Sequence, residues 1–135
     1  MSIIEWNKGF SVGVEKFDNQ HKKLFKILND FYLGVSEKNT IKNQQLLTAK
    51  LLEYAEKHFS DEEDLMNKLE YPGFTEHKEM HDRYIMRVKN YSKKLDEEIA
   101  LDDKEVSEFL VNWMVSHIQH TDCKYGSFFN KHHIK

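Results

Sequence analysis

The stretch "LLEYAEKHFSDEEDLM" (residues 51–66) carries an apolar stripe into which polar residues are set. His58 lies seven residues after Leu51, and Glu62 lies four residues before Met66, so all four share one face of an α-helix. The segment therefore predicts a helix whose inward face carries an imidazole and a carboxylate beside ordinary core residues.

Apolar residues at helical spacing predict three further helices around this one. The chain has one proline and five glycines, so long helices are expected. The proline stands in "YPG" (71–73), which separates two helices because the residue before a proline avoids helical angles. Asp18 is the expected N-cap of the first helix, and Asp102 with Glu105 forms a capping box for the last. We expect helices at about residues 19–34, 41–69, 76–99 and 103–121.

Four helices joined by short links predict an all-α protein with the up-down-up-down topology of a four-helix bundle. Residues 1–17 lack a helical pattern and are expected to form an N-terminal arm, and residues 126–135 a polar tail. A chain of 135 residues is the size of one domain, so residues 1–135 are expected to fold as a single unit.

The composition excludes several classes of protein. Charged residues make up 32% of the chain and the net charge is −3, so no basic patch invites nucleic acid. No stretch approaches the roughly 18 apolar residues of a membrane span. The N-terminus lacks the pattern of a signal peptide, and the single cysteine, Cys123, excludes an internal disulfide. We expect a cytoplasmic monomer without nucleic-acid or membrane partners.

Histidine is the unusual component, with eight in the chain. Five of them fall on the inward faces of the expected helices: His21, His58, His77, His81 and His117. The pair in "TEHKEMHDRY" (75–84) is not the zinc-protease motif, because Lys78 stands where the catalytic glutamate is needed. Burying so many imidazoles with a carboxylate costs several kcal/mol unless each has a partner. A metal ion bound between facing helices would supply that partner.

Near the end of the last helix, two residues compete as a further ligand. His120 lies three residues after His117, close to the same face. Asp122 lies five residues after His117, about 140° round an ideal helix, so only a loosened turn would bring it inward. Periodicity leaves this choice open. His132 and His133 belong to the polar tail and are expected to be solvated.

Five imidazoles and one or two carboxylates are too many ligands for one tetrahedral zinc ion. They suit two ions of iron, manganese or zinc, with carboxylates bridging the pair. The Glu-x-x-His repeats of ferritin-like di-iron proteins are absent. Neutral imidazoles in place of anions favour reduced metals, and therefore oxygen binding over oxygen activation.

Four segments resemble the hemerythrins, specifically the single-domain bacterial ones. They are "DNQHKKLF" (18–25), "HFSDEEDLM" (58–66), "YPGFTEHKEMH" (71–81) and "WMVSHIQHTDCKY" (113–125), and the arm "EWNKGFSVGVEKFD" is similar as well. The resemblance covers nearly the whole chain, in order.

The resemblance implies a bundle that binds dioxygen reversibly at two non-haem iron ions, bridged by carboxylates and by a hydroxide or oxide ion. By matching position, it implies one iron held by His77, His81 and His117, and a second, with an open position, held by His21 and His58. Glu62 and Asp122 would bridge them, so the resemblance favours Asp122 over His120. The implied oxygen pocket is lined by Leu24, Trp113, Met114 and Ile118.

These residues lead to an oxygen-binding protein for storage, delivery or sensing, and not to an enzyme. The alternative is a di-iron redox enzyme that uses the same site for peroxide or nitric oxide. A structural zinc bundle is a third reading. A partner that consumes oxygen or reduces the irons is not identified by the sequence.

Overall fold

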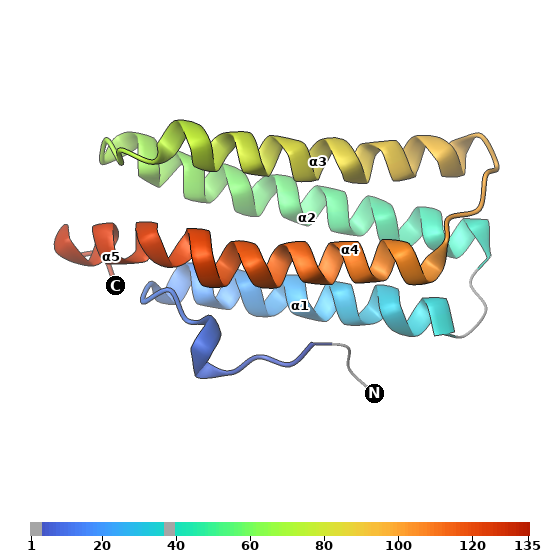
Figure 1. The fold of residues 1–135 in the computed structure, drawn as a ribbon, viewed down its shortest axis with the longest axis horizontal. Helices are drawn as coiled ribbons and strands as arrows, with labels where there is room; N and C mark the ends of the chain where they lie inside the picture. Colours follow the sequence, from blue (N-terminus) through green and yellow to red (C-terminus); the bar gives the residue numbers. More distant parts are fainter. Residues whose placement is uncertain (1–3, 37–39) are drawn as a thin grey trace.

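The computed structural model describes residues 4–36 and 40–135, and it confirms the predicted all-α four-helix bundle. Consecutive long helices run side by side in opposite directions, with α5 continuing beyond α4 (Figure 1). The elements are η1 (Lys8–Phe10), α1 (Glu15–Ser36), α2 (Ile41–Lys68), α3 (Phe74–Asp96), α4 (Asp103–Ser116), η2 (His117–Asp122) and α5 (Cys123–Lys131).

The first helix begins earlier than the sequence predicts. α1 starts at Glu15 instead of residue 19, so Asp18 lies within its first turn and is not its N-cap. The Asp18 carboxylate instead accepts hydrogen bonds from the Val12 backbone N–H at 2.8 Å and from the Ser11 hydroxyl at 2.6 Å. Asp18 therefore ties the arm to the helix.

The C-terminal end differs most from the prediction. The expected helix at 103–121 is α-helical only to Ser116, and a π-helix, η2, follows it. The expected polar tail at 126–135 is wrong as far as Lys131, because α5 extends to that residue. Tyr125 and Phe129 are buried, and the ring centroid of Phe17 on α1 lies 5.5 Å from that of Tyr125 and 6.1 Å from that of Phe129. These contacts hold α5 against the bundle.

The other helix ends lie near their expected positions. α2 ends at Lys68, and α3 runs from Phe74 to Asp96 where residues 76–99 were expected. The Asp102 side chain accepts a hydrogen bond from the Glu105 backbone N–H at 3.1 Å, as an N-cap does.

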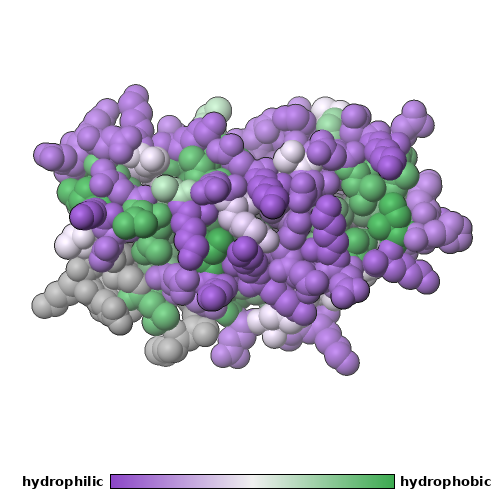
Figure 2. Space-filling view, turned by 180° about the vertical axis from the view of Figure 1, so that it is seen from behind, coloured by the Kyte–Doolittle hydropathy of each residue, from purple (hydrophilic) through white to green (hydrophobic). Residues whose placement is uncertain are grey.

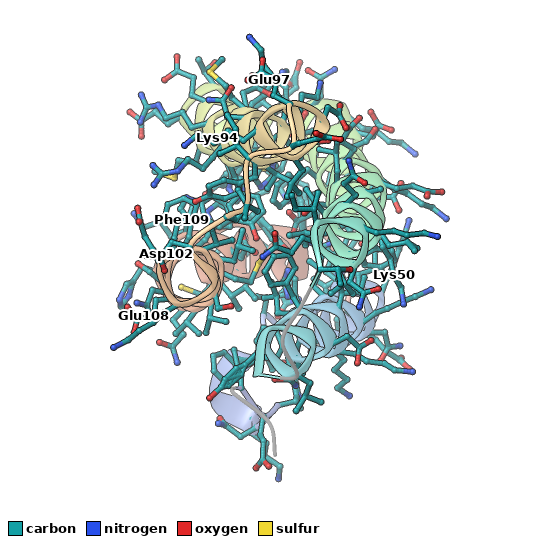
Figure 3. All side chains as sticks on the ribbon, turned by 90° about the vertical axis from the view of Figure 1, so that its right-hand side faces the viewer. Lys50, Lys94, Glu97, Asp102, Glu108 and Phe109 are labelled. Atoms are coloured by element: carbon teal, nitrogen blue, oxygen red, sulfur yellow. The ribbon has the colours of Figure 1, made fainter. Side chains whose placement is uncertain are left out.

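Side chains from all four long helices fill the space along the bundle axis, as the end-on view shows (Figure 3). Charged residues such as Lys50 and Glu108 project outward. The face in Figure 2 is largely hydrophilic, with smaller hydrophobic areas between the charged side chains. Among the described residues, no helix is both long and apolar enough to cross a membrane.

The N-terminal arm is part of the packed structure. Phe10, Val12 and Val14 are buried, and the rings of Phe10 and Phe25 meet edge to face at 4.9 Å. The arm lies so close to α5 that a Cβ atom on Gly126 would stand 1.9 Å from the carbonyl oxygen of Val12. Gly126 is therefore the residue that lets the arm backbone approach the C-terminal helix.

Replacing Gly126 with alanine should displace the arm. The atom that the new methyl group meets is backbone and cannot rotate away, so we expect a loss of about 2–3 kcal/mol in the free energy of unfolding. Urea denaturation measures this loss. Gly9→Ala is the matched control, because its Cβ meets only the Asn7 side chain, at 2.9 Å. Equal losses in the two variants would contradict the proposed packing.

Candidate metal centre

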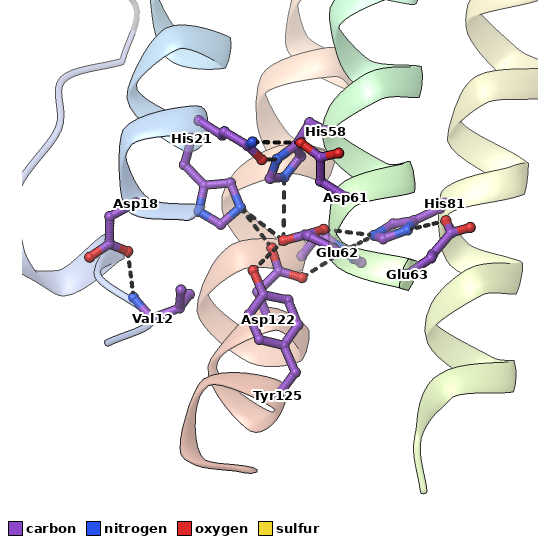
Figure 4. A network of polar contacts seen from close by, with 12 residues as sticks. Val12, Asp18, His21, His58, Asp61, Glu62, Glu63, His81, Asp122 and Tyr125 are labelled. Carbon is purple, nitrogen blue, oxygen red and sulfur yellow. Dashed lines mark hydrogen bonds and ion pairs between the residues drawn. The ribbon is translucent and has the colours of Figure 1, made fainter. Parts of the chain in front are cut away.

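Seven polar side chains meet inside the bundle, and none is more than 5% exposed. Each of the four long helices or its continuation supplies at least one of them. They are His21 on α1, His58 and Glu62 on α2, His77 and His81 on α3, and His117 and Asp122 on η2. Figure 4 shows Glu62 and Asp122 at the centre of this network, between His21 and His81.

Three of the imidazoles form one group. His81 Nε2 lies 3.1 Å from His117 Nε2. The ring centroids of His77 and His117 are 4.8 Å apart, and those of His77 and His81 are 4.5 Å apart. With Asp122, these residues direct four ligand atoms to within 4.8 Å of one another. We call this group the three-histidine position.

The other two imidazoles form a second group. The rings of His21 and His58 have centroids 4.7 Å apart. Their ligand atoms, with those of Glu62 and Asp122, also lie within 4.8 Å of one another. We call this group the two-histidine position.

Each carboxylate divides its oxygens between the two positions. Glu62 Oε1 lies 3.3 Å from His81 Nε2, whereas Oε2 lies 3.4 Å from His21 Nε2 and 3.3 Å from His58 Nε2. Asp122 Oδ1 lies 2.9 Å from His77 Nε2 and 3.0 Å from His117 Nε2, whereas Oδ2 lies 3.1 Å from His21 Nε2. Such an arrangement can bridge two cations.

The π-helix explains how Asp122 reaches this centre. In η2 the hydrogen bonds run between residues five apart, so His117 and Asp122 come to lie on nearly the same face. Both are buried, whereas His120 is exposed. The loosened turn that Asp122 requires is therefore present.

Many of these buried atoms lack a hydrogen-bond partner, although they face one another. Among the described residues they include Nε2 of His21, His58 and His77, Oε1 of Glu62 and both oxygens of Asp122. Buried polar groups are rarely left in this state, because each costs free energy. Imidazole and carboxylate are the ligands of iron, zinc and similar ions. The residues therefore fit two such ions.

Without a metal, the two carboxylates of the centre are ionised and some of its imidazoles are protonated. Burial alone raises the pKa of Glu62 and Asp122, but neighbouring imidazoles outweigh it and hold both pKa values well below the usual range. Burial lowers the pKa of His21 and His81, but the carboxylates outweigh it and raise both pKa values to about 9. For His58, burial prevails and lowers the pKa. Metal binding must therefore displace protons.

These shifts predict how pH affects the metal-free protein. The raised pKa values of His21 and His81 contribute stability that is complete below their ordinary value of 6.5 and is lost as pH rises through about 9. The lowered pKa of His58 acts in the opposite direction, but its effect falls below pH 6.5, under the range in which His21 and His81 lose their protons. The depressed carboxyl pKa values of Glu62 and Asp122 add stability that is lost in acid.

We therefore expect the unfolding free energy of the metal-free protein to fall between pH 6.5 and 9.5, as measured by urea denaturation. The metal-loaded protein serves as the control, because its ligand nitrogens carry no proton to lose. A rise in metal-free stability over this range would contradict the proposed protonation.

A second layer of polar residues lies behind the seven converging side chains, and helical spacing did not predict it. Glu63 accepts from His81 Nδ1 at 2.8 Å, and Gln20 Oε1 lies 2.6 Å from His58 Nδ1. The buried Tyr125 donates its hydroxyl hydrogen to Glu62 Oε2. Helical spacing gives no signal for Gln20 and Glu63, since each sits beside a ligand in sequence, off the apolar stripe. Tyr125 lay beyond the expected helix end.

Apolar residues enclose the centre. Leu24, Met114 and Ile118, three of the expected pocket residues, are at most 1% exposed. Trp113, the fourth, stacks on His117 with ring centroids 4.4 Å apart. This contact places Trp113 beside the three-histidine position, and its part in an oxygen pocket stays a prediction. The indole also packs against Tyr84 on α3, with ring centroids 4.2 Å apart.

Proteins of one family are similar to this chain over most of its length. The family model of the Hemerythrin HHE cation binding domain matches residues 12–128. The bacteriohemerythrin of Clostridium acetobutylicum is 36% identical over 127 residues, covering 91% of this chain and 98% of that protein. The myohemerythrin of Theromyzon tessulatum is 32% identical over 121 residues, covering 90% of this chain and 89% of its own length. A crystal structure of wild-type hemerythrin superposes with a TM-score of 0.87 at 27% identity, covering 93% of this chain and 97% of that one.

Proposed function

This chain belongs to the hemerythrin family, and we propose that it binds dioxygen reversibly at two non-haem iron ions, for oxygen storage, delivery or sensing. His77, His81 and His117 would hold one iron, and His21 and His58 the other. Glu62 and Asp122 would bridge the pair. The observation that carries this assignment is the division of each carboxylate's oxygens between the two groups of imidazoles.

The two positions differ in the number of protein ligands that face them. Both carboxylates serve both positions, but one has three imidazoles and the other two. The two-histidine position therefore leaves more room for a small exogenous ligand, and we assign dioxygen binding to it. The iron pair would supply the affinity and the electrons that this binding needs.

The rest of the protein's contribution is exclusion of water and protons. The seven ligand side chains are buried, and Leu24, Met114 and Ile118 belong to the same hydrophobic core. A dry, apolar surrounding slows proton entry and the irreversible oxidation that follows from it. These features support reversible binding over catalysis, because the reduction of peroxide or nitric oxide consumes protons that a dry, apolar surrounding does not deliver.

The test is an absorption spectrum of the iron-loaded, reduced protein as oxygen is admitted and then removed. We expect a visible band that appears with oxygen and disappears on its removal without added reductant. A band that resets only with a reductant would replace the proposal by the di-iron redox enzyme. A protein that takes up zinc but stays colourless with iron and oxygen would support the structural zinc bundle instead.

A further inference from the structure

The second layer of residues differs in charge between the two metal positions. Behind the three-histidine position stands a carboxylate, Glu63, and behind the two-histidine position stands an amide, Gln20. A hydrogen-bond acceptor behind a ligating imidazole sets its tautomer and its strength as a donor to the metal. The difference therefore bears directly on how tightly each position holds its ion.

Glu63 strengthens its ligand. Its Oε2 lies 2.8 Å from His81 Nδ1, so the imidazole donates this N–H and directs Nε2 toward the centre. The Glu63 side chain is only 17% exposed, which limits the screening of its charge by water. An anionic acceptor draws the proton from Nδ1 and raises the electron density on Nε2.

Gln20 orients its ligand without this charge. Its Oε1 lies 2.6 Å from His58 Nδ1, while its Nε2 donates to Asp61 Oδ2 at 2.9 Å. Because a carboxylate can only accept, Asp61 turns the amide so that its oxygen faces His58. His58 therefore also directs Nε2 toward the centre, but it receives less electron density than His81.

Two further features weaken the same side. The Tyr125 hydroxyl donates to Glu62 Oε2, the oxygen that faces His21 and His58, and so withdraws electron density from it. In this contact the phenol is the donor, because a carboxylate oxygen can only accept. His21 Nδ1 is buried, and within the part of the chain that the structure describes it has no hydrogen-bond partner that would strengthen the ring as a donor.

From these contacts we infer that Glu63, Gln20 and Tyr125 are positioning residues that make the three-histidine position the stronger site and the two-histidine position the weaker one. The two-histidine position then loads second and releases its ion first. This inference rests on the two metal positions of the proposed function. The unequal number of imidazoles already makes the two positions differ in metal affinity. The inference adds that residues outside the ligand set increase this difference.

The test is a titration of the metal-free protein with Co²⁺, followed by its visible absorption, which needs neither iron nor oxygen. We expect two binding steps of unequal affinity. Glu63→Gln should weaken the tighter step about 10–100-fold and leave the weaker step unchanged. Tyr125→Phe should have the opposite sign and strengthen the weaker step about tenfold, a result that simple loosening of the core would not give.

Controls separate charge from contact. Glu56 lines the same surface pocket as Glu63 and is exposed, but the contacts described for it include no hydrogen bond to a histidine. Glu56→Gln removes the same charge and should leave both steps within about twofold of the parent. His21→Ala should remove only the weaker step, and so assigns the two steps to their positions.

The outcomes distinguish the two proposals. If fewer than two Co²⁺ ions bind per protein, the two-metal assignment of the proposed function fails. If two ions bind with equal affinity, only the inference on the second layer fails. If Co²⁺ binds in two steps but Glu63→Gln behaves like Glu56→Gln, or Tyr125→Phe weakens both steps, the inference on the second layer is overturned and the proposed function stands.

Discussion

Replacing Asp122 with asparagine is expected to abolish tight binding of both metal ions, a loss of more than about 100-fold in affinity at each position. One oxygen of Asp122 faces His77 and His117, and the other faces His21. An amide offers a single neutral oxygen, so it can neither bridge two cations nor neutralise their charge. The loss should exceed the 10–100-fold that second-layer changes typically cost. Equilibrium dialysis with Fe²⁺ under argon measures it.

His120→Ala is the matched control for this variant. His120 lies in the same π-helix and was the competing candidate by spacing, but it is exposed. We expect the alanine variant to bind two ions as the parent does. Far-UV circular dichroism of both metal-free variants verifies that the helices are retained. Two ions bound by Asp122→Asn, with binding lost in His120→Ala, would reverse the assignment.

The contrast between these two residues shows where the sequence sufficed. The five inward histidines and Glu62 follow the apolar stripes of regular helices, so a period of 3.6 residues brought them to the core. Asp122 lies off that stripe by about 140° on an ideal helix, and it turns inward only because η2 is a π-helix. No pattern in the residues distinguished a π-helical turn from an α-helical one, and the resemblance to a known family supplied Asp122 as a candidate ligand.

Other features depend on contacts between segments that are distant in the chain. Gln20 is 38 residues from His58, and Tyr125 is 63 residues from Glu62, so helical spacing relates neither pair. Residues 126–131 of α5 were predicted to belong to a polar tail because the buried face of this helix is short. The apolar residues of α5 are buried only because they pack against the arm and α1. The ring centroids of Phe17 on α1 and Tyr125 are 5.5 Å apart.

The second large effect concerns stability: loading with Fe²⁺ should raise the melting temperature of the protein by roughly 15–20 °C. An ion that binds only the folded state stabilises it by about 2.7 kcal/mol at a free concentration 100 times its dissociation constant. Two such ions contribute about 5 kcal/mol, and a domain of this size gains roughly 3–4 °C for each kcal/mol. Differential scanning calorimetry under argon, with and without Fe²⁺, measures the shift.

The physical reason for so large a shift is that the metal-free core contains polar groups whose hydrogen bonds are unmade. His58 Nε2, His77 Nε2 and both oxygens of Asp122 are among the buried atoms without a partner. Metal ions would satisfy these atoms together, and unfolding would have to break the metal–ligand bonds. Mg²⁺ is the control cation, because it prefers oxygen ligands and keeps its water, so we expect a shift below about 2 °C. Removal of iron by a chelator should restore the original melting temperature. An equal rise with Mg²⁺, or an undiminished rise in Asp122→Asn, would show that the stabilisation arises elsewhere than at the seven converging side chains.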